Sequence, residues 1–166
     1  MVERLILADK SKIAYEGIFI VRELYEKVDY FTEFRGYQKR ELSSSETITK
    51  TGRKILHKYE LWKQLSDYSR SVIRINMTLD EVKDIEIEKE GLKKHANQGK
   101  TTILMDAVLE NDFEHRWENK PGFFFMRVLF DKYIFKPFTT DYQGFVMRDF
   151  TDLRNELSAI LNLYKY

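Results

Sequence analysis

The sequence contains no cysteine, and only two of its 166 residues are proline, Pro121 and Pro137. The absence of cysteine excludes disulfide bonds, thiolate ligands for a metal and thiol nucleophiles. It also fits a reducing compartment, so we expect a cytoplasmic protein. Because no segment rich in glycine, serine or proline interrupts the chain, we predict a single domain over residues 1–166.

Long apolar runs and an excess of charge of either sign are missing as well. No stretch of about 18 apolar residues is present, so no membrane-spanning helix is expected. The N-terminus also lacks the apolar core of a secretory signal. Lysine and arginine number 28 against 27 aspartates and glutamates. A dedicated nucleic-acid binder usually has a basic excess, so no nucleic-acid partner is expected.

The familiar signatures of catalysis are absent too. The sequence has no glycine-rich phosphate loop and no serine in a nucleophile elbow. We therefore predict no catalytic residue and no cofactor, and leave open a hydrolase or lyase that would use His57 with a nearby carboxylate. Oxygen and imidazole ligands for a metal could come from one cluster, Asp112, Glu114, His115 and Glu118. A charged linker is the favoured interpretation of this cluster, so no metal ligand is predicted.

Regular alternation of apolar and polar residues marks the middle of the chain as strands. The clearest case is Val72–Leu79, where Ile73, Ile75 and Met77 face one side and polar residues face the other. Turn signals such as Lys50-Thr51-Gly52 separate the segments. The pattern predicts strands at Val2–Ala8, Tyr37–Ile48, Arg53–Leu65, Val72–Leu79, Lys83–Glu88, Leu92–Ala96 and Thr101–Leu109, and it leaves a further short strand at Ile13–Glu16 open.

Helical spacing appears before and after these strands. A first helix is predicted at Ile18–Phe34 and ends at Gly36. A phenylalanine-rich helix is predicted at 123–135, and a last helix has a regular apolar stripe from Val146 to Ile160. We therefore predict an α+β fold: a curved antiparallel sheet of about six to seven strands, one helix after the first strand or strands, and two C-terminal helices packed on one face.

This order of elements resembles the helix-grip fold of the START and Bet v 1-like superfamily. In that superfamily a strand and helical structure precede a run of antiparallel strands, and a long C-terminal helix closes a cavity. Here one long helix replaces two short ones, and the phenylalanine-rich helix is an addition. The resemblance implies a pocket for an apolar ligand between the sheet and the last helix. The chain is also similar to uncharacterised archaeal proteins with the segments Arg116-Trp117-Glu118 and Asp131-Lys132-Tyr133.

The first functional hypothesis is a non-enzymatic binding protein with an apolar ligand in this cavity. His57 and Tyr59 fall on the inward side of their strand, where they would orient the ligand through polar atoms. A slip of one residue in the strand would instead turn His57 to water. The predicted ligand-binding residues are His57, Tyr59, Ile75, Met77, Met105, Phe150 and Leu153.

The second hypothesis is a structural or assembly subunit. Three consecutive phenylalanines, Phe123 to Phe125, cannot all face one core, because neighbours in a helix differ by about 100°. At least one is expected on a second surface, which could be the other helix, a ligand cavity, a protein partner or a copy of the chain. Burial under the last helix stays open, and a membrane is less favoured because Asp131 interrupts the basic face. The predicted partner-binding residues are Phe123, Phe124, Arg127 and Tyr133.

Overall fold

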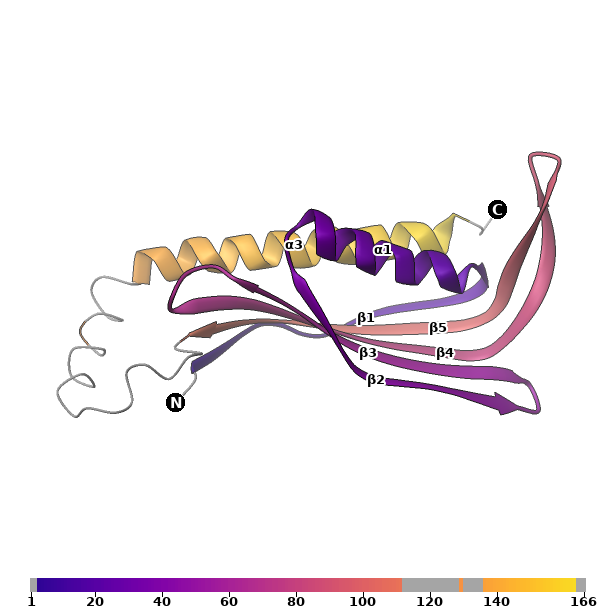
Figure 1. The fold of residues 1–166 in the computed structure, drawn as a ribbon, viewed down its shortest axis with the longest axis horizontal. Helices are drawn as coiled ribbons and strands as arrows, with labels where there is room; N and C mark the ends of the chain where they lie inside the picture. The colour runs from indigo at the N-terminus through magenta and orange to yellow at the C-terminus, as the bar shows by residue number, and fades with distance from the viewer. Residues whose placement is uncertain (1–2, 112–128, 130–135, 164–166) are drawn as a thin grey trace.

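The computed structural model describes residues 3–111, 129 and 136–163, which form an α+β fold (Figure 1). Its strands and helices follow the order β1, α1, β2, β3, β4, β5 and α3. The bounds of these elements are β1 Glu3–Phe19, α1 Val21–Phe34, β2 Gln38–Thr49, β3 Gly52–Gln64, β4 Ser69–Lys89, β5 Leu92–Asn111 and α3 Lys136–Asn162.

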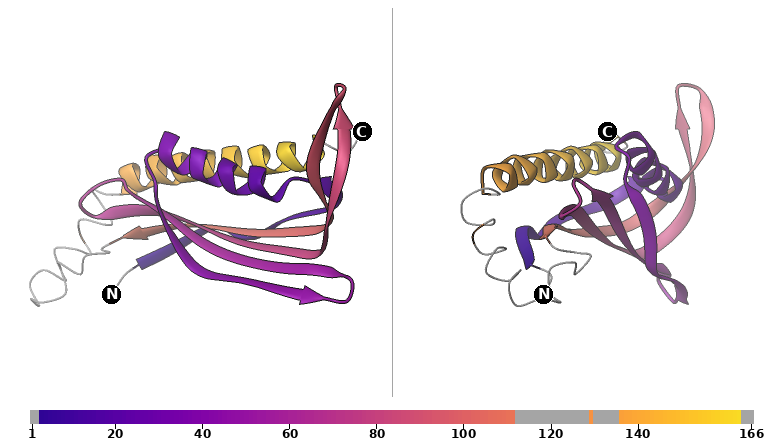
Figure 2. Two further views of the ribbon diagram at one scale, coloured as in Figure 1. Left: turned by 45° about the vertical axis from the view of Figure 1, so that its right-hand side comes forward. Right: turned by 60° about the vertical axis from the view of Figure 1, so that its left-hand side comes forward.

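The described strands make one open antiparallel sheet of five strands in the order β1-β5-β4-β3-β2. Both α1 and α3 lie over the same face of this sheet (Figures 1 and 2). The buried core lies between that face and the helices, and Ile73, Ile75, Leu153 and Leu157 are all 0% exposed within it. Burial of their apolar surface is the main force that holds the helices on the sheet.

The described sheet has five strands, whereas the sequence predicts about six to seven, because β1, β4 and β5 each join two predicted segments. Each break in alternation predicts a strand end, whereas the structure carries the strand through it. β1 continues past Lys10, which has a positive φ of 48°, and β4 continues past Glu81, with φ of 54°. The ladders shift register at both places. Such β-bulges bend a strand without ending it.

The placement of the helices also differs from the prediction. Ile18 and Phe19, predicted to be helical, pair with Gln98 and Asn97 as the last residues of β1. Two C-terminal helices are predicted on the sheet, whereas the structure describes one, α3, and its companion on that face is α1. The phenylalanine-rich segment at 123–135 lies outside the described residues, except for Leu129.

A sharp bend divides the long β4–β5 hairpin near Glu81. Beyond it the hairpin rises past the helix layer (Figures 1 and 2). Glycines from the neighbouring strands lie against this bend. A Cβ atom on Gly52 would come within 2.7 Å of the Glu81 carbonyl carbon, and one on Gly99 within 2.7 Å of the Asp80 carbonyl oxygen. The bend therefore depends on the missing side chains at these two positions.

A buried polar network ties α3 to the rest of the fold. Asp149, which is 1% exposed, accepts hydrogen bonds from the Tyr37 hydroxyl at 2.9 Å and from Arg35 at 2.9 Å. Because the Tyr37 hydroxyl gives its proton to Asp149, the Ser71 hydroxyl at 2.9 Å donates to the Tyr37 oxygen. The second branch of Arg35 donates to Asp152 at 2.7 Å. These bonds join the end of α1, β4 and α3.

Candidate functional site

The residues predicted to line a cavity beneath α3 lie together in the hydrophobic core. Ile75, Met105 and Leu153 are 0% exposed and Met77 is 1% exposed. Phe150 and Tyr59 are also buried in the same cluster. A side chain that borders a water-sized cavity keeps accessible surface on that side, and these side chains keep almost none. Open space within the described structure therefore has to be sought elsewhere.

His57 lies beside such a space, on the face of β3 that α1 covers. Its neighbours across the sheet are Ser44 in β2 and Met77 in β4. The imidazole meets the ring of Tyr25 edge to face, with centroids 4.8 Å apart. It also stacks on Tyr59, with centroids 5.7 Å apart and an angle of 5° between the planes. Two aromatic side chains thus fix the orientation of His57.

A cavity of about 260 Å³ opens between α1 and the β2–β3 hairpin next to this imidazole. Its walls combine apolar side chains of α1 and β3 with hydroxyl and carboxylate groups of β2. Arg53 also borders it, but its guanidinium donates to Glu46 at 3.1 Å and to Asp84 at 2.6 Å, so its charge is compensated. The lining residues are Val21, Tyr25, Ser44, Ser45, Glu46, Arg53, Ile55 and His57.

The two ring nitrogens of His57 make no hydrogen bond with any described residue, and Nδ1 is buried. An unpaired buried donor or acceptor costs about 1–3 kcal/mol, so Nδ1 carries this cost whether or not it holds the hydrogen. Nε2 is not among the buried unpaired atoms. It is therefore the ring atom that is open to a hydrogen bond with a molecule in the cavity.

Tyrosines around the site are neutral at physiological pH. Burial, with Glu41 and Asp29 as smaller contributions, raises the pKa of Tyr59 from 10.0 to about 12. Burial is also the main cause that raises the pKa of Tyr25 and of Tyr37. The buried hydroxyls thus stay protonated when exposed tyrosines begin to ionise.

These shifts predict a loss of stability in alkali. The unfolded chain loses tyrosine protons near pH 10.0 while folded Tyr59 keeps its proton up to about 12. The folded state then binds more protons, so the free energy of unfolding falls as the pH rises across this window. Urea denaturation at a series of pH values should show the fall, with a shallower slope for Tyr59→Phe. A free energy of unfolding that stays constant across the window would contradict this expectation.

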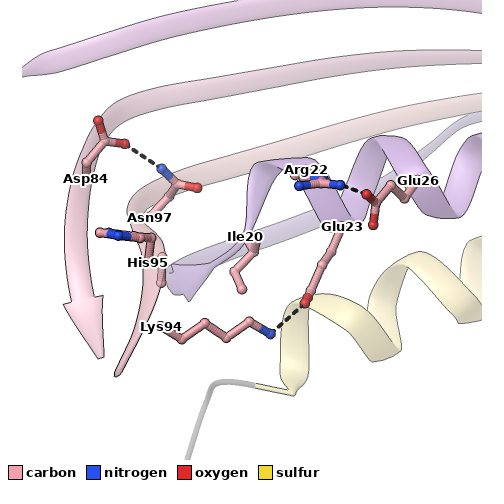
Figure 3. A pocket seen from close by; sticks show the side chains of 9 residues that line it. Ile20, Arg22, Glu23, Glu26, Asp84, Lys94, His95 and Asn97 are labelled. Atoms are coloured by element: carbon pink, nitrogen blue, oxygen red, sulfur yellow. Dashed lines mark hydrogen bonds and ion pairs between the residues drawn. The ribbon is translucent and has the colours of Figure 1, made fainter. Parts of the chain in front are cut away.

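A larger cavity of about 680 Å³ lies between the start of α1 and the bent β4–β5 hairpin (Figure 3). Its charged side chains form pairs of opposite charge. Lys94 binds Glu23 across the cavity at 3.1 Å, and Arg22 binds Glu26 at 2.6 Å. On the hairpin, the Asn97 amide donates to Asp84 at 2.8 Å. The polar groups of these pairs already have hydrogen-bond partners in the protein. The cavity beside His57, in contrast, borders a side chain whose ring nitrogens have no partner among the described residues.

Several predicted site residues belong to the part of the chain between β5 and α3. Phe123, Phe124, Arg127 and Tyr133 lie outside the described residues, as does the cluster from Asp112 to Glu118. Among the residues that are described, no group of three or more histidines and carboxylates could hold a metal ion. Neither described helix combines the length and apolarity needed to cross a bilayer.

The sequence prediction missed most of the cavity wall. Tyr25 flanks the apolar stripe of its helix, and this position is the only feature of the sequence that indicates its place in the cavity wall. Ser44 and Ser45 have the pattern of a solvated strand, and nothing in it indicates a cavity. Comparison of the chain with protein-family models, with curated proteins and with solved structures found no significant match.

Proposed function

We propose that this chain is a non-enzymatic binding protein of the helix-grip type, with its small-molecule site between α1 and β3. The observation that carries the proposal is His57, which lines a cavity while neither of its ring nitrogens has a partner among the described residues. The order of a strand and helix, consecutive antiparallel strands and a long final helix supports the helix-grip interpretation. The proposed site lies beside α1, because the core beneath α3 is filled.

The cavity favours a small, uncharged, largely planar ligand. Its volume of about 260 Å³ lies just below the usual range of ligand pockets, about 300–1,000 Å³, so only a small molecule fits. Tyr25 and His57 offer aromatic surface, and Val21 and Ile55 offer aliphatic surface. Arg53, the one arginine or lysine among the described lining residues, already binds two carboxylates. A single hydrogen-bonding group on the ligand would meet Nε2 of His57.

Phenol is a suitable probe, because it has an aromatic ring and one hydroxyl. We expect phenol to shift the imidazole resonances of His57 in NMR spectra. His57→Phe keeps the ring packing but removes Nε2, so it should weaken phenol binding about tenfold, the value of one hydrogen bond. His95→Phe is the matched control, because the His95 side chain is 92% exposed and borders the other cavity.

Two outcomes would reject the proposed site. One is binding of phenol to His57→Phe with the affinity of the unchanged chain. The other is an equal loss of affinity in His95→Phe, which would indicate weak, unspecific contact with aromatic surface. A saturating shift confined to residues around Tyr25, Ser44 and His57 would support the proposal.

A second candidate function is an assembly subunit that buries the phenylalanine-rich helix on a partner or on a second copy. The structural observation that favours self-association comes from another part of the chain, the fully exposed strand β2. The two candidate functions share β2, because Ser44, Ser45 and Glu46 of this strand also line the cavity beside His57.

A further inference from the structure

Strand β2 forms one edge of the sheet and is exposed along its whole length. All twelve residues of Gln38–Thr49 are exposed, and among the described residues β2 pairs only with β3. The segment Leu42–Thr49 carries a single charge, that of Glu46, and Ile48 is 84% exposed. A long edge strand with few charges leaves unpaired N–H and C=O groups that can accept another strand.

The opposite edge, β1, has features that hinder such pairing. Its register shifts twice, between Ile6 and Ala8 and between Ala8 and Ser11. Lys10 in this region has a positive φ, and its backbone N–H donates to the Asp106 carboxylate at 2.7 Å. Arg154 of α3 also donates to Ser11 at 2.9 Å. Bulges and basic side chains of this kind protect an edge from association, so the two edges of this sheet differ.

The charges of β2 are complementary to those of a second, antiparallel β2. Lys39 lies opposite Leu61 and Glu46 lies opposite Ile55, and both of these β3 residues are buried beneath the helices. Residues paired across antiparallel strands share a face, so Lys39 and Glu46 point to the same face of the sheet. Lys39 and Glu46 are an odd number of positions apart, which in a regular strand would put them on opposite faces. The register shift between Glu41 and Ser43 adds one residue, and this brings both side chains to the same face.

Leu42 has no partner in the β2–β3 ladder and is the extra residue of the bulge. A two-fold axis at Ser43 would therefore place Lys39 of each copy opposite Glu46 of the other. In this register Glu41 faces Ser44, so no like charges meet. Moving one copy by two residues would set Glu41 against Glu46, which is repulsive. The charge pattern thus favours one self-complementary register, as a symmetric interface requires.

We propose that β2 pairs with β2 of a second copy of this chain, in the antiparallel register that joins Lys39 to Glu46 twice. The product is a dimer with one continuous sheet, in which the helices of both copies lie on the same face. The existing partners of these residues, Asp29 for Lys39 and Arg53 for Glu46, keep solvent-accessible surface, so Lys39 and Glu46 can share the new contacts. This inference does not depend on the ligand site beside His57.

Charge reversal tests the interface and its register together. Analytical ultracentrifugation of the full chain is expected to show a dimer. Lys39→Glu and Glu46→Lys should each weaken it at least about tenfold, because each turns two attractive pairs into two repulsive ones. An equimolar mixture of the two variants should restore the dimer. In the mixed dimer the introduced glutamate faces the introduced lysine, and the native Lys39 of one copy faces the native Glu46 of the other.

Glu88→Lys is the control for Glu46→Lys, because it makes the same change of charge on the exposed hairpin tip. Circular dichroism verifies that each variant is folded. A strictly monomeric unchanged chain would overturn the proposal, as would single variants that dimerise like the control. If the single variants were monomeric and their mixture stayed monomeric, the proposed register would be wrong. Slower amide exchange in β2 on concentration of the unchanged protein would support it.

Discussion

Asp149→Ala is expected to lower the free energy of unfolding by about 3 kcal/mol or more. The substitution removes the acceptor of two hydrogen bonds, from Tyr37 and from Arg35, at a residue that is 1% exposed. A hydrogen bond to a charged group contributes about 1.5–3 kcal/mol. The Tyr37 hydroxyl would then be left in the interior with Ser71 as its remaining partner.

Asp152→Ala is a close control for this change. Asp152 binds the same arginine, Arg35, at 2.7 Å, but its side chain is 39% exposed. Exposed ion pairs contribute about 0–1 kcal/mol, so this variant should stay near the stability of the unchanged protein. Chemical denaturation of both variants measures the difference. If Asp149→Ala and Asp152→Ala had the same effect, the network would not hold α3 in the way proposed.

Gly52→Ala is expected to destabilise the fold by about 2–4 kcal/mol. Its φ of 145° is unfavourable for other residues, and the added Cβ would meet backbone atoms of Glu81 and Val82 at 2.7–3.0 Å. Gly99→Ala should also be destabilising, through contact with the Asp80 carbonyl oxygen at 2.7 Å. These backbone atoms lie in a bulge with paired residues on both sides, so they cannot move away without disturbing the ladder.

Gly91→Ala separates the two causes of this loss. Gly91 also has a positive φ, of 76°, but an added Cβ would have no neighbour within 4 Å. It should therefore cost only the backbone strain, about 1–2 kcal/mol. Thermal or urea unfolding of the three variants would rank them. A loss for Gly52→Ala no larger than that for Gly91→Ala would show that the bend tolerates a side chain.

The sequence predicted the buried face of the fold better than the lengths of its elements. Alternation identified Ile73, Ile75 and Met77, and helical spacing identified Leu153 and Leu157, all of which are in the core. These patterns depend only on the period of a strand or helix, so they indicate the buried residues even when the tertiary structure is unknown. The order of strands along the chain follows from the same signals.

Strand continuity could not be predicted in this way. A bulge and a turn both interrupt alternation, and the chain resembles a turn at Lys10 and at Glu81 although it continues as a strand. The difference depends on whether a neighbouring strand stays paired beyond the interruption. At Glu81 that pairing requires Gly52 and Gly99, which are distant in sequence. Such long-range compatibility is visible only in three dimensions.

The candidate site was predictable only on the strand side. Alternation in β3 placed His57 on the inward face, where the structure has it next to Tyr25. The position of Tyr25 depends on how α1 crosses the sheet, and the sequence does not specify this. The filling of the core beneath α3 was equally hidden, because it depends on the summed volumes of side chains from several elements.

The bent β4–β5 hairpin determines where local unfolding of the sheet begins. Beyond the bulge, the stretch from Ile85 to Ala96 is a two-stranded ribbon whose described partners in the ladder are its own residues. Two-stranded ribbons are barely stable alone in water, whereas the middle of the sheet has neighbours on both sides. Amide hydrogens should therefore exchange with solvent fastest at the hairpin tip, and the fast exchange should end at the bulge. Local unfolding of this ribbon would leave the rest of the sheet paired. The bulge therefore separates a hairpin tip that unfolds locally from a central sheet that unfolds cooperatively.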